Sequence, residues 1–583
     1  MAKPKTKPNP WDFLDEFRGT HFTGRWPTIP QMFDITTERY PQNNCFTVFS
    51  PTEFTLNYSE AKEKILQIAS YLVELGVKAD TKVAVTGKNS PEWAIAYLAI
   101  LYAGAIVVPL DYQLSDKEID FLLTFSEVEI LFIDKERIDA IDADEKVGLK
   151  HKISLEEGHD DYIFTKKSSK KQKLPTGKEE DLAAILYTSG TTGNPKGVML
   201  THSNIVSDCY LAQAHLSVYP TDVFYALLPI HHSYTMLAVF IEAIGTGSEI
   251  VFGKKLVVSQ ILKELKKGKV TMFLAVPMLF NKMLSGLMNG IREKGVIVYG
   301  LIRFLMGFSG LVKKLFKVNP GKKMFNKVLA NLSMDNIRIC ISGGGPLPFS
   351  TFSLFNQLGV DFVQGYGLTE TSPIITLNPI DAYIETSVGK ILPETEMKIL
   401  NPDQRGVGEI AVRGPMVMQG YYKNQEATDE VLDKEGWFKT GDAGYIDSKN
   451  YVYLTGRTKS LIVTEGGKNV FPEEIEDRFQ LFDEIEQICV LGYLIDKKMK
   501  SEGIRAVIYP SDTFRDKAAS LHADEKEQHS FILHHMQEII DKVNKDLHQY
   551  EKIDRLTIAK EPMEMTSTKK IKRHVIAEQY KNE

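Results

Sequence analysis

Between residues 58 and 134 the chain alternates stretches that have helical spacing of apolar residues with short runs that are wholly apolar. The helical stretches are 61–75, 92–102 and 116–125, and the apolar runs are 83–85, 106–109 and 129–133. Helices of this length between short apolar runs predict βαβ units and a parallel sheet. The pattern therefore predicts an α/β fold.

The pattern changes after Val388, where short alternating runs such as 409–412 and 451–454 are separated by Gly, Asp and Asn turns. Runs of this kind are typical of smaller antiparallel sheets. Further strand and helix patterns follow Arg457, at 475–481, 488–493, 506–509 and 531–547. We expect a large N-terminal domain at 1–457, built of parallel α/β sheets plus a β-rich subdomain, and a small mobile C-terminal α+β domain at 458–583.

Residues 295–316 form another periodic stretch, with a wide apolar face at positions 297, 301, 304, 305, 308, 312 and 315. Glycines, Arg303 and Lys314 fall on the opposite stripe, which is amphipathic helical spacing. Two interpretations stay open: a helix packed on the core, or an interfacial helix that collects a lipid from an anionic membrane. No stretch reaches the roughly 18 apolar residues of a membrane-spanning helix, so none is expected.

Composition narrows the classes of protein. At 583 residues the chain is too long for one hydrophobic core. A net charge of −6 gives no general attraction to nucleic acid, so no nucleic-acid partner is expected. The four cysteines lie far apart without a CxxC pair, which favours a reducing compartment over zinc or disulfides. The first ten residues lack an apolar signal, and the expected location is the cytoplasm, with peripheral contact at the cytoplasmic face of a membrane left open.

A glycine-rich segment, YTSGTTGNPKG at 187–197, follows the apolar run 183–186. Glycines let successive backbone N–H groups point at a phosphate, hydroxyls add donors, and a lysine adds charge. The segment is not a P-loop, because Pro195 and Gly197 break the spacing that this motif requires. The candidate phosphate-binding residues are Thr188, Ser189, Gly190, Thr191, Thr192, Gly193 and Lys196.

The string YTSGTTGNPKGV resembles the phosphate-binding signature of the adenylate-forming (AMP-binding) superfamily. Five further segments resemble motifs of that superfamily and occur in its order, at 229–234, 342–347, 364–371, 437–442 and 456–459. The resemblance implies an N-terminal ATP- and acyl-binding domain, a mobile C-terminal lid domain, and ATP, Mg²⁺ and coenzyme A as cofactor, metal and co-substrate.

For the larger domain, the resemblance implies that Thr369 contacts phosphate and that Glu370, together with Thr188, holds Mg²⁺. Such a hard cation prefers oxygen ligands. His232 is in register with a histidine that lines the acyl and thiol passage, although a structural role for it stays open. The remaining implied nucleotide contacts are Gly343, Gly344, Gly345, Gln364, Gly365, Tyr366 and Gly367.

Towards the C-terminus the resemblance implies ribose contacts at Asp442 and Arg457 and a hinge at Lys459. The implied coenzyme A contacts are Gly466, Gly467 and Lys468. The last motif lacks the family's glycine, and aligning Thr568 with the family threonine makes Lys570 the catalytic lysine. Lys569 and Lys572 stay open as alternatives. The implied catalytic set is Thr188, His232, Glu370 and Lys570.

The segment 295–316, the form of the lysine motif and the GKNVFPEEIE loop resemble long-chain fatty acyl-CoA synthetases. The implied reaction is activation of a fatty acid to acyl-AMP with release of pyrophosphate, followed by transfer to the thiol of coenzyme A. An acyl carrier protein synthetase and a ligase that stops at acyl-AMP are the alternatives. Intact polar motifs argue against a protein that only binds acyl groups or nucleotides. Chain length and oligomeric state are left open.

Overall fold

The computed structural model describes residues 9–141, 148–188, 195–254, 257–345, 347–464, 468–480, 482–496, 501–565 and 571–581. The chain divides into two compact units, here called unit 1 and unit 2. Unit 1 comprises Met1–Gly344, Phe352–Met397 and Val412–Phe438, and unit 2 comprises Gly345–Thr351, Lys398–Ala411 and Lys439–Glu583. The predicted boundary at 457/458 is the point about which the C-terminal domain is expected to move. It stays a prediction.

Unit 1 contains a seven-stranded sheet in the order β18-β8-β7-β4-β3-β5-β6. The strands are β3 (Lys82–Thr86), β4 (Ile106–Leu110), β5 (Val128–Ile133), β6 (His151–Ser154), β7 (Leu182–Thr188), β8 (Lys196–Thr201) and β18 (Gly420–Tyr421). Strands β3 to β7 run parallel to their neighbours, whereas β8 pairs antiparallel with both β7 and β18. The parallel α/β pattern predicted for 58–134 is confirmed.

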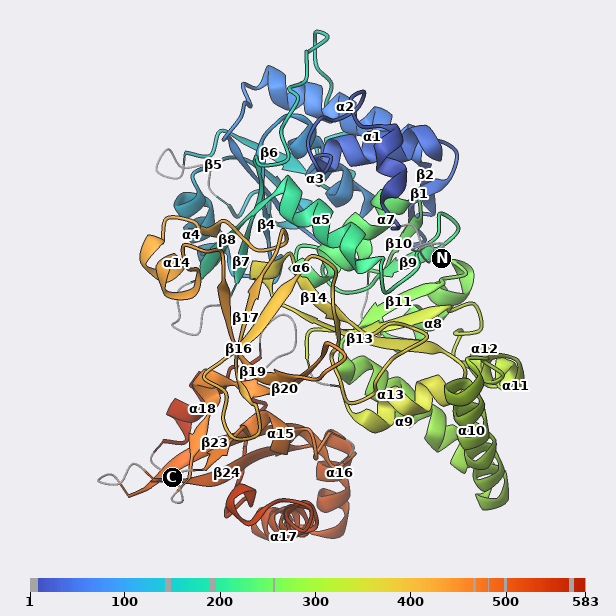
Figure 1. The fold of residues 1–583 in the computed structure, drawn as a ribbon, viewed down its shortest axis with the longest axis vertical. Helices are drawn as coiled ribbons and strands as arrows, with labels where there is room; N and C mark the ends of the chain where they lie inside the picture. The colour runs from blue at the N-terminus through green and yellow to red at the C-terminus, as the bar shows by residue number, and fades with distance from the viewer. Residues whose placement is uncertain are drawn as a thin grey trace, which may run out of the picture. The chain divides into compact units, whose positions relative to one another are not determined.

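The helices predicted between those strands are present as α2 (Tyr58–Glu74), α3 (Pro91–Tyr102) and α4 (Asp116–Ser126) (Figure 1). Asn57, Ser90 and Ser115 cap their N-termini by accepting hydrogen bonds from backbone N–H groups of the first turn. Every residue of α3 except Glu92 is buried. This complete burial explains why α3 is apolar on all sides, in contrast to the amphipathic α2.

Nine strands of unit 1 form a second sheet in the order β15-β14-β13-β12-β11-β9-β10-β1-β2. They are β1 (Asn44–Val48), β2 (Phe54–Asn57), β9 (Val223–Ala226), β10 (Glu249–Phe252), β11 (Met272–Ala275), β12 (Ile339–Ser342), β13 (Asp361–Gly367), β14 (Ile374–Leu377) and β15 (Gly389–Ile391). The central strands are parallel, whereas β2 pairs antiparallel with β1, and β14 pairs antiparallel with both β13 and β15. Strand β7 of the first sheet and strands β12 and β13 of the second each end within a predicted motif.

Unit 1 also contains further helices. The longer ones are α1 (Ile29–Arg39), α5 (His202–Ala212), α8 (Val258–Lys267), α9 (Pro277–Arg292), α10 (Val296–Phe316) and α13 (Phe349–Gln357), the last of which begins in unit 2. The shorter ones are η1 (Asp12–Glu16), η2 (Lys135–Arg137), η3 (Ile163–Thr165), α6 (Ser233–Thr235), η4 (Met236–Ile241), α7 (Glu242–Thr246), α11 (Gly321–Met324), α12 (Asn326–Asn331), η5 (Thr369–Thr371) and α14 (Gln425–Val431). Buried rings of Trp93, Tyr97 and Phe240 pack against one another in the core.

Unit 2 holds most of β16 (Glu396–Leu400), β17 (Gly408–Arg413) and β19 (Phe438–Ile446), and all of β20 (Tyr451–Arg457). After η6 (Thr458–Ser460), β21 (Ile462–Val463), β22 (Asn469–Val470) and α15 (Pro472–Glu476), a three-stranded sheet contains β23 (Ile485–Asp496), β24 (Ser501–Pro510) and β25 (Arg555–Ile558). Its helices are α16 (Asp512–Leu521), α17 (Glu525–Asn544), η7 (Gln549–Glu551) and α18 (Arg573–Gln579). The expected β-rich segment and the small α+β segment are both present.

Helix α10 confirms the amphipathic helix predicted at 295–316, but its apolar face points outward. Within α10, only Met306, Ser309 and Lys313 are buried. The interpretation of a helix packed on the core therefore does not hold for its apolar face. By length and composition α10 is apolar enough to cross a bilayer, so the expectation that no segment meets this criterion is wrong. Its glycines and its serine interrupt the run of large apolar residues, so the sequence pattern did not indicate an apolar helix of this length.

Candidate active site

Two predicted phosphate-binding residues, Thr188 and Lys196, lie opposite each other at the ends of β7 and β8. Antiparallel pairing places them in register, so the glycine-rich segment connects two adjacent strands. Ser189, Gly190, Thr191, Thr192 and Gly193 lie outside the described residues. The Thr188 hydroxyl and the Lys196 ammonium thus belong to paired residues at the ends of two adjacent strands.

Tyr421 connects Lys196 to Glu370. Its phenol donates a hydrogen bond to Oε1 of Glu370 at 2.8 Å, and the Lys196 Nζ lies 4.6 Å from the centroid of its ring. Strand β18 carries Tyr421 and pairs with β8, which brings it beside Lys196. A cation and a carboxylate from distant motifs therefore meet at one aromatic side chain.

Glu370 lies in η5, directly after β13, and is partly exposed. The backbone N–H of Met418 donates to the Glu370 carbonyl at 2.9 Å, so main chain and side chain are both held. An oxygen-only side chain that is fixed and reachable by solvent fits a hard cation such as Mg²⁺. Thr188, the second predicted metal ligand, supplies a hydroxyl that is also partly exposed.

The histidine motif reaches the same region through hydroxyl groups. Ser233 Oγ and Thr369 Oγ1 share a hydrogen bond of 2.9 Å, which joins α6 to η5. His232 caps α6, because its Nδ1 accepts from the Tyr234 N–H at 3.4 Å. The neighbouring His231 is the more enclosed ring: its Nε2 lies 3.6 Å from Oδ1 of Asp111, and burial lowers the pKa of His231.

Gly343 follows β12 and lies against the ring of Tyr234. A Cβ at Gly343 would come within 2.9 Å of this ring, whose hydroxyl donates to the Ile341 carbonyl at 3.1 Å. Only glycine lets the backbone pass this close without displacing the ring. Gly344 has a φ of +81° and open space around its Cβ position, and Gly345 is the next residue in the chain.

Strand β13 carries Gln364, Gly365, Tyr366 and Gly367 between β12 and β14. Gln364 is buried, whereas Tyr366 is partly exposed at the end of the strand that leads to Glu370. A Cβ at Gly367 would approach the Pro373 carbonyl oxygen to 1.6 Å. The chain's own backbone therefore requires glycine there, whatever its part in nucleotide binding.

In unit 2, Asp442 and Arg457 are paired residues of the antiparallel strands β19 and β20. The Arg457 Nε lies 2.9 Å from Oδ1 of Asp442, and the Asp442 side chain is nearly buried. The fold thus joins the two predicted ribose contacts. Lys459 follows in the short helix η6, where Thr458 donates to the Gly441 carbonyl at 3.0 Å.

Several predicted residues lie outside the described part of the chain, namely Gly466, Gly467, Lys569 and Lys570. Lys468 is described and accepts backbone and side-chain hydrogen bonds from Thr464 at its carbonyl. The alternative catalytic lysine, Lys572, is ion-paired with Glu564, and its backbone N–H donates to the Glu564 carbonyl. Its ammonium is therefore engaged within unit 2.

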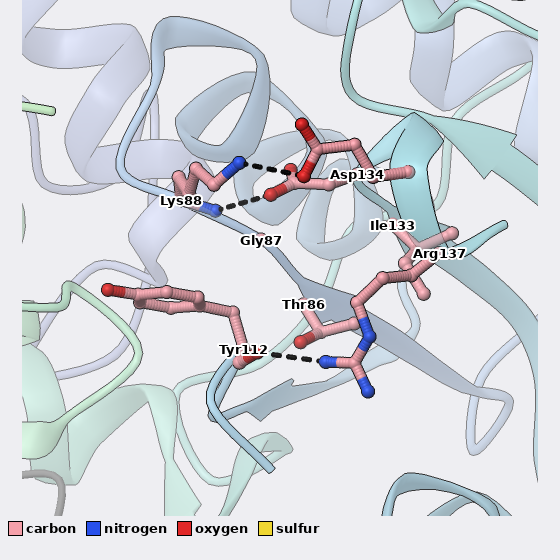
Figure 2. Close-up of a pocket in the computed structure, with 8 residues that line it drawn as sticks. Thr86, Gly87, Lys88, Tyr112, Ile133, Asp134 and Arg137 are labelled. Atoms are coloured by element: carbon pink, nitrogen blue, oxygen red, sulfur yellow. Dashed lines mark hydrogen bonds and ion pairs between the residues drawn. The ribbon is translucent and has the colours of Figure 1, made fainter. Parts of the chain in front are cut away.

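A separate cavity of about 160 Å³ lies at the carboxyl ends of β3 and β5. Figure 2 shows Lys88 beside Asp134, whose carboxylate accepts from the Lys88 backbone N–H at 3.1 Å. The Lys88 ammonium donates to Glu136 at 3.2 Å. Arg137 donates to the Tyr112 carbonyl at 2.8 Å. None of the predicted motif residues lines this cavity.

Sequence reasoning missed Tyr421 and Ser233 as members of the site, although both are held against predicted residues. Ser233 lies within the histidine motif and could have been considered as a hydroxyl neighbour. Tyr421 is 51 positions from Glu370, and nothing in its spacing indicates the contact. Only the pairing of β18 with β8 reveals it.

The contact of Lys196 and Glu370 with one tyrosine ring in unit 1 fits the class of nucleotide-dependent carboxylate-activating enzymes that the motifs indicate. The chain belongs to the AMP-binding enzyme family, whose sequence pattern matches residues 33–422. The superfamily inferred from the motifs is thereby confirmed, and so is the expectation of an enzyme.

Curated relatives include both acceptor types that the sequence left open. The chain is 28% identical to a chloroplastic long-chain-fatty-acid–[acyl-carrier-protein] ligase of Arabidopsis thaliana, over 81% of this chain and 75% of that protein. It is 30% identical to the long-chain-fatty-acid–CoA ligase FadD15 of Mycobacterium bovis, over 74% of each. Relatives with these names agree with the predicted reaction and with its alternative.

Solved structures confirm the fold. An anthranilate CoA ligase in complex with anthranoyl-AMP matches with a TM-score of 0.75 at 20% identity, covering 96% of this chain and 98% of that one. The o-succinylbenzoate coenzyme A synthetase of Bacillus subtilis, solved with ATP and magnesium, matches with a TM-score of 0.69 at 22% identity, covering 93% and 98%. The α/β architecture expected from the sequence is that of adenylate-forming enzymes.

Proposed function

We propose that this chain is an ATP-dependent fatty acid ligase that forms acyl-AMP and then an acyl thioester of coenzyme A. The observation that carries the proposal is the contact chain from Lys196 through Tyr421 to Glu370. It gives one place in unit 1 a positive charge for phosphate and a carboxylate for a metal ion. Named relatives that act on long-chain fatty acids support the choice of acid.

In the first half-reaction a carboxylate oxygen of the fatty acid attacks the α-phosphorus of ATP, and pyrophosphate leaves. Phosphoryl chemistry of this kind needs positioning and neutralisation of charge more than covalent catalysis. We assign phosphate binding to the segment from Thr188 to Lys196 and to Thr369, and metal binding to Glu370 with Thr188. Lys570 supplies the remaining positive charge, and Mg²⁺ neutralises the phosphates when bound.

In the second half-reaction the thiol sulfur attacks the acyl carbonyl, AMP leaves, and the thiol proton goes to solvent. We assign the change between the two reactions to movement of residues 458–583 about Lys459. Gly466, Gly467 and Lys468 then contact the thiol substrate, and His232 lines its passage. Asp442 and Arg457 bind the ribose hydroxyls, for which a carboxylate is a suitable acceptor.

The same proposal places the protein in the cytoplasm, with peripheral contact to a membrane through residues 295–316. A long-chain fatty acid is poorly soluble and is concentrated in lipid, so access to a bilayer would raise its local concentration. The exposed apolar face of α10 supports this placement.

Release of pyrophosphate by the purified chain tests the proposal, with ATP, Mg²⁺ and palmitate as substrates. Release should require palmitate and should be lost with Glu370→Gln, whereas Glu396→Gln at an exposed carboxylate should retain it. Adding coenzyme A or phosphopantetheinylated acyl carrier protein then identifies the acceptor. No release with any fatty acid from short to long would overturn the enzyme assignment, and discharge by the carrier protein alone would replace coenzyme A as the acceptor.

A further inference from the structure

Helix α10 presents a continuous apolar stripe to solvent. Six residues at alternating steps of four and three lie on one face, and all are exposed: Ile297, Leu301, Phe304, Phe308, Leu311 and Leu315. The side chains of Ile297, Phe304 and Phe308 are 87%, 71% and 53% exposed. Scattered single apolar residues are ordinary on protein surfaces, but a contiguous stripe of large ones marks an interaction site.

The opposite face of α10 is anchored to unit 1. Lys313 is buried, and its Nζ lies 2.7 Å from Oδ1 of Asp361 and 2.7 Å from the side-chain oxygen of Asn356. A Cβ on Gly310 would approach the side chain of Gln357 to 2.7 Å, so the helix lies close to α13 at that point. These contacts fix which face is outward, and the apolar stripe cannot turn into the core.

The anchor also argues against a membrane-spanning arrangement. A buried ammonium paired with a carboxylate would lose its partner if α10 entered the hydrocarbon, which costs several kcal/mol. Figure 1 shows α10 extending away from the sheets of unit 1 with its N-terminal end outermost. A helix held along one side and apolar along the other is suited to lie in the plane of an interface.

The charged residues around α10 indicate the kind of interface that it binds. The segment 294–334 contains no Asp or Glu, and its cations are Lys294, Arg303, Lys313, Lys314, Lys317, Lys322, Lys323 and Lys327. The whole chain carries a net charge of −6, so this segment is strongly unlike the rest. Lys294, Arg303, Lys323 and Lys327 are exposed. Cations beside an apolar helix favour a surface of anionic lipid.

A second copy of the chain fits this surface less well. Two copies that met through α10 would bring two acid-free cationic segments together, and like charges in contact oppose association. An anionic bilayer satisfies the cations and the apolar stripe at the same time.

We propose that α10, with the cations of 294–327, docks unit 1 on an anionic lipid bilayer and lies in its interface. The docked face consists of the six stripe residues, and Lys323 and Lys327 contact lipid headgroups. The proposal deepens and rests on the proposed function, because it gives a fatty acid ligase direct access to the phase that holds its substrate. Binding to lipid is measured without turnover, so the docking proposal and the proposed ligase activity can each fail without the other.

Flotation of the full chain with vesicles tests the proposal. The wild type should float with vesicles of phosphatidylcholine containing phosphatidylglycerol, and much less with phosphatidylcholine alone or at high salt. Phe304→Glu combined with Phe308→Glu should lower the bound fraction by more than about tenfold, because both phenylalanine rings would leave the lipid and two carboxylates would face it. Lys323→Glu combined with Lys327→Glu should lower it on anionic vesicles only.

Phe121→Glu is the matched control, since Phe121 lies on α4 of the same unit and its 52% exposure equals that of Phe308 within one per cent. It should float like the wild type, and the double phenylalanine variant should keep pyrophosphate release with a water-soluble short-chain acid. Equal flotation of the wild type and the double phenylalanine variant would overturn the proposal. So would a concentration-dependent dimer that the same variant abolishes, because the stripe would then bind a second copy.

Discussion

The phenol of Tyr421 donates a hydrogen bond of 2.8 Å to Oε1 of Glu370, although 51 positions separate the two residues. The same ring lies 4.6 Å from the ammonium of Lys196. Tyr421 therefore orients the carboxylate that we assign to the metal ion and covers the lysine that we assign to phosphate. Both assignments make Tyr421 a positioning residue, because it acts through its neighbours.

Tyr421→Phe should lower kcat for pyrophosphate release about tenfold and raise the Mg²⁺ concentration that gives half-maximal rate. A hydrogen bond to a charged group contributes about 1.5 kcal/mol or more, which corresponds to roughly tenfold in rate. The phenylalanine ring preserves the contact with Lys196, so the variant isolates the bond to Glu370. Initial rates across a Mg²⁺ titration provide the measurement.

Tyr422→Phe is the matched control for this prediction. The Tyr422 hydroxyl donates to Glu127 at 3.2 Å rather than to Glu370. It should leave both kcat and the Mg²⁺ dependence unchanged. An unchanged Mg²⁺ dependence in Tyr421→Phe would contradict the role given to this bond.

Gly343→Ala should lower the apparent thermal midpoint and weaken ATP binding, because the new methyl group meets the Tyr234 ring at 2.9 Å. Overpacking of this kind costs about 1–3 kcal/mol. Tyr234→Leu removes the ring atoms in question, so the further cost of Gly343→Ala should be smaller in that background. Differential scanning fluorimetry on the four proteins of this cycle measures the coupling. If Gly343→Ala lowers the thermal midpoint equally in the wild type and in Tyr234→Leu, the new methyl group does not clash with the Tyr234 ring.

Glu242→Gln should become more stable relative to the wild type as the pH rises from 5 to 8. Burial raises the pKa of Glu242 to about 8, and the Cys209 thiol lies within hydrogen-bonding distance of Oε2, at 3.2 Å. Over this range Glu242 is ionised in the unfolded chain, whereas in the folded protein it keeps its proton until the pH approaches 8. Folding thus loses stability with rising pH by about 1.4 kcal/mol per unit of pKa difference. Glutamine does not titrate and removes this loss.

The thermal midpoints of both proteins at pH 5 and pH 8 give the comparison. Glu396→Gln is the control, because Arg413 holds the pKa of Glu396 below its usual value and this carboxylate stays ionised across the range. A constant difference between the wild type and Glu242→Gln at the two pH values would mean that Glu242 is ionised in the folded protein.

Lys570→Ala should slow acyl-AMP formation at least about a hundredfold, the usual cost of removing a group that stabilises developing charge. Lys572→Ala should change the rate by less than about twofold, because the Lys572 ammonium is paired with Glu564. Lys569→Ala tests the remaining alternative. Pyrophosphate release measured for the three variants decides among them, and a large loss in Lys572→Ala alone would overturn the alignment of Thr568.

Motif residues and their order could be read from the sequence, whereas the contacts between motifs could not. The pairing of Asp442 with Arg457 was implicit in two adjacent motifs on neighbouring strands. The contact of Tyr421 with Glu370 depends on β18 pairing with β8, which joins segments more than two hundred residues apart. Local patterns carry no information about such register.

Helix α10 shows a second limit. Periodicity identified the helix and its apolar face, but a period does not say whether that face points inward or outward. The buried side is instead the stripe of Met306, Ser309 and Lys313, where small and polar residues permit close approach and an ion pair. The ion pair to Asp361 decides the orientation, and no pattern in the sequence indicates it.

Asp361 has a further consequence, because it is the first residue of β13. This strand is seven residues long, roughly 20 Å, and the chain enters η5 with Glu370 soon after its last residue, Gly367. Helix α10, which we propose to face lipid, is thus bound to one end of β13, and Glu370, to which we assign the metal ion, follows the other end. If both assignments hold, the length of this one strand sets the separation between the bilayer and the metal site.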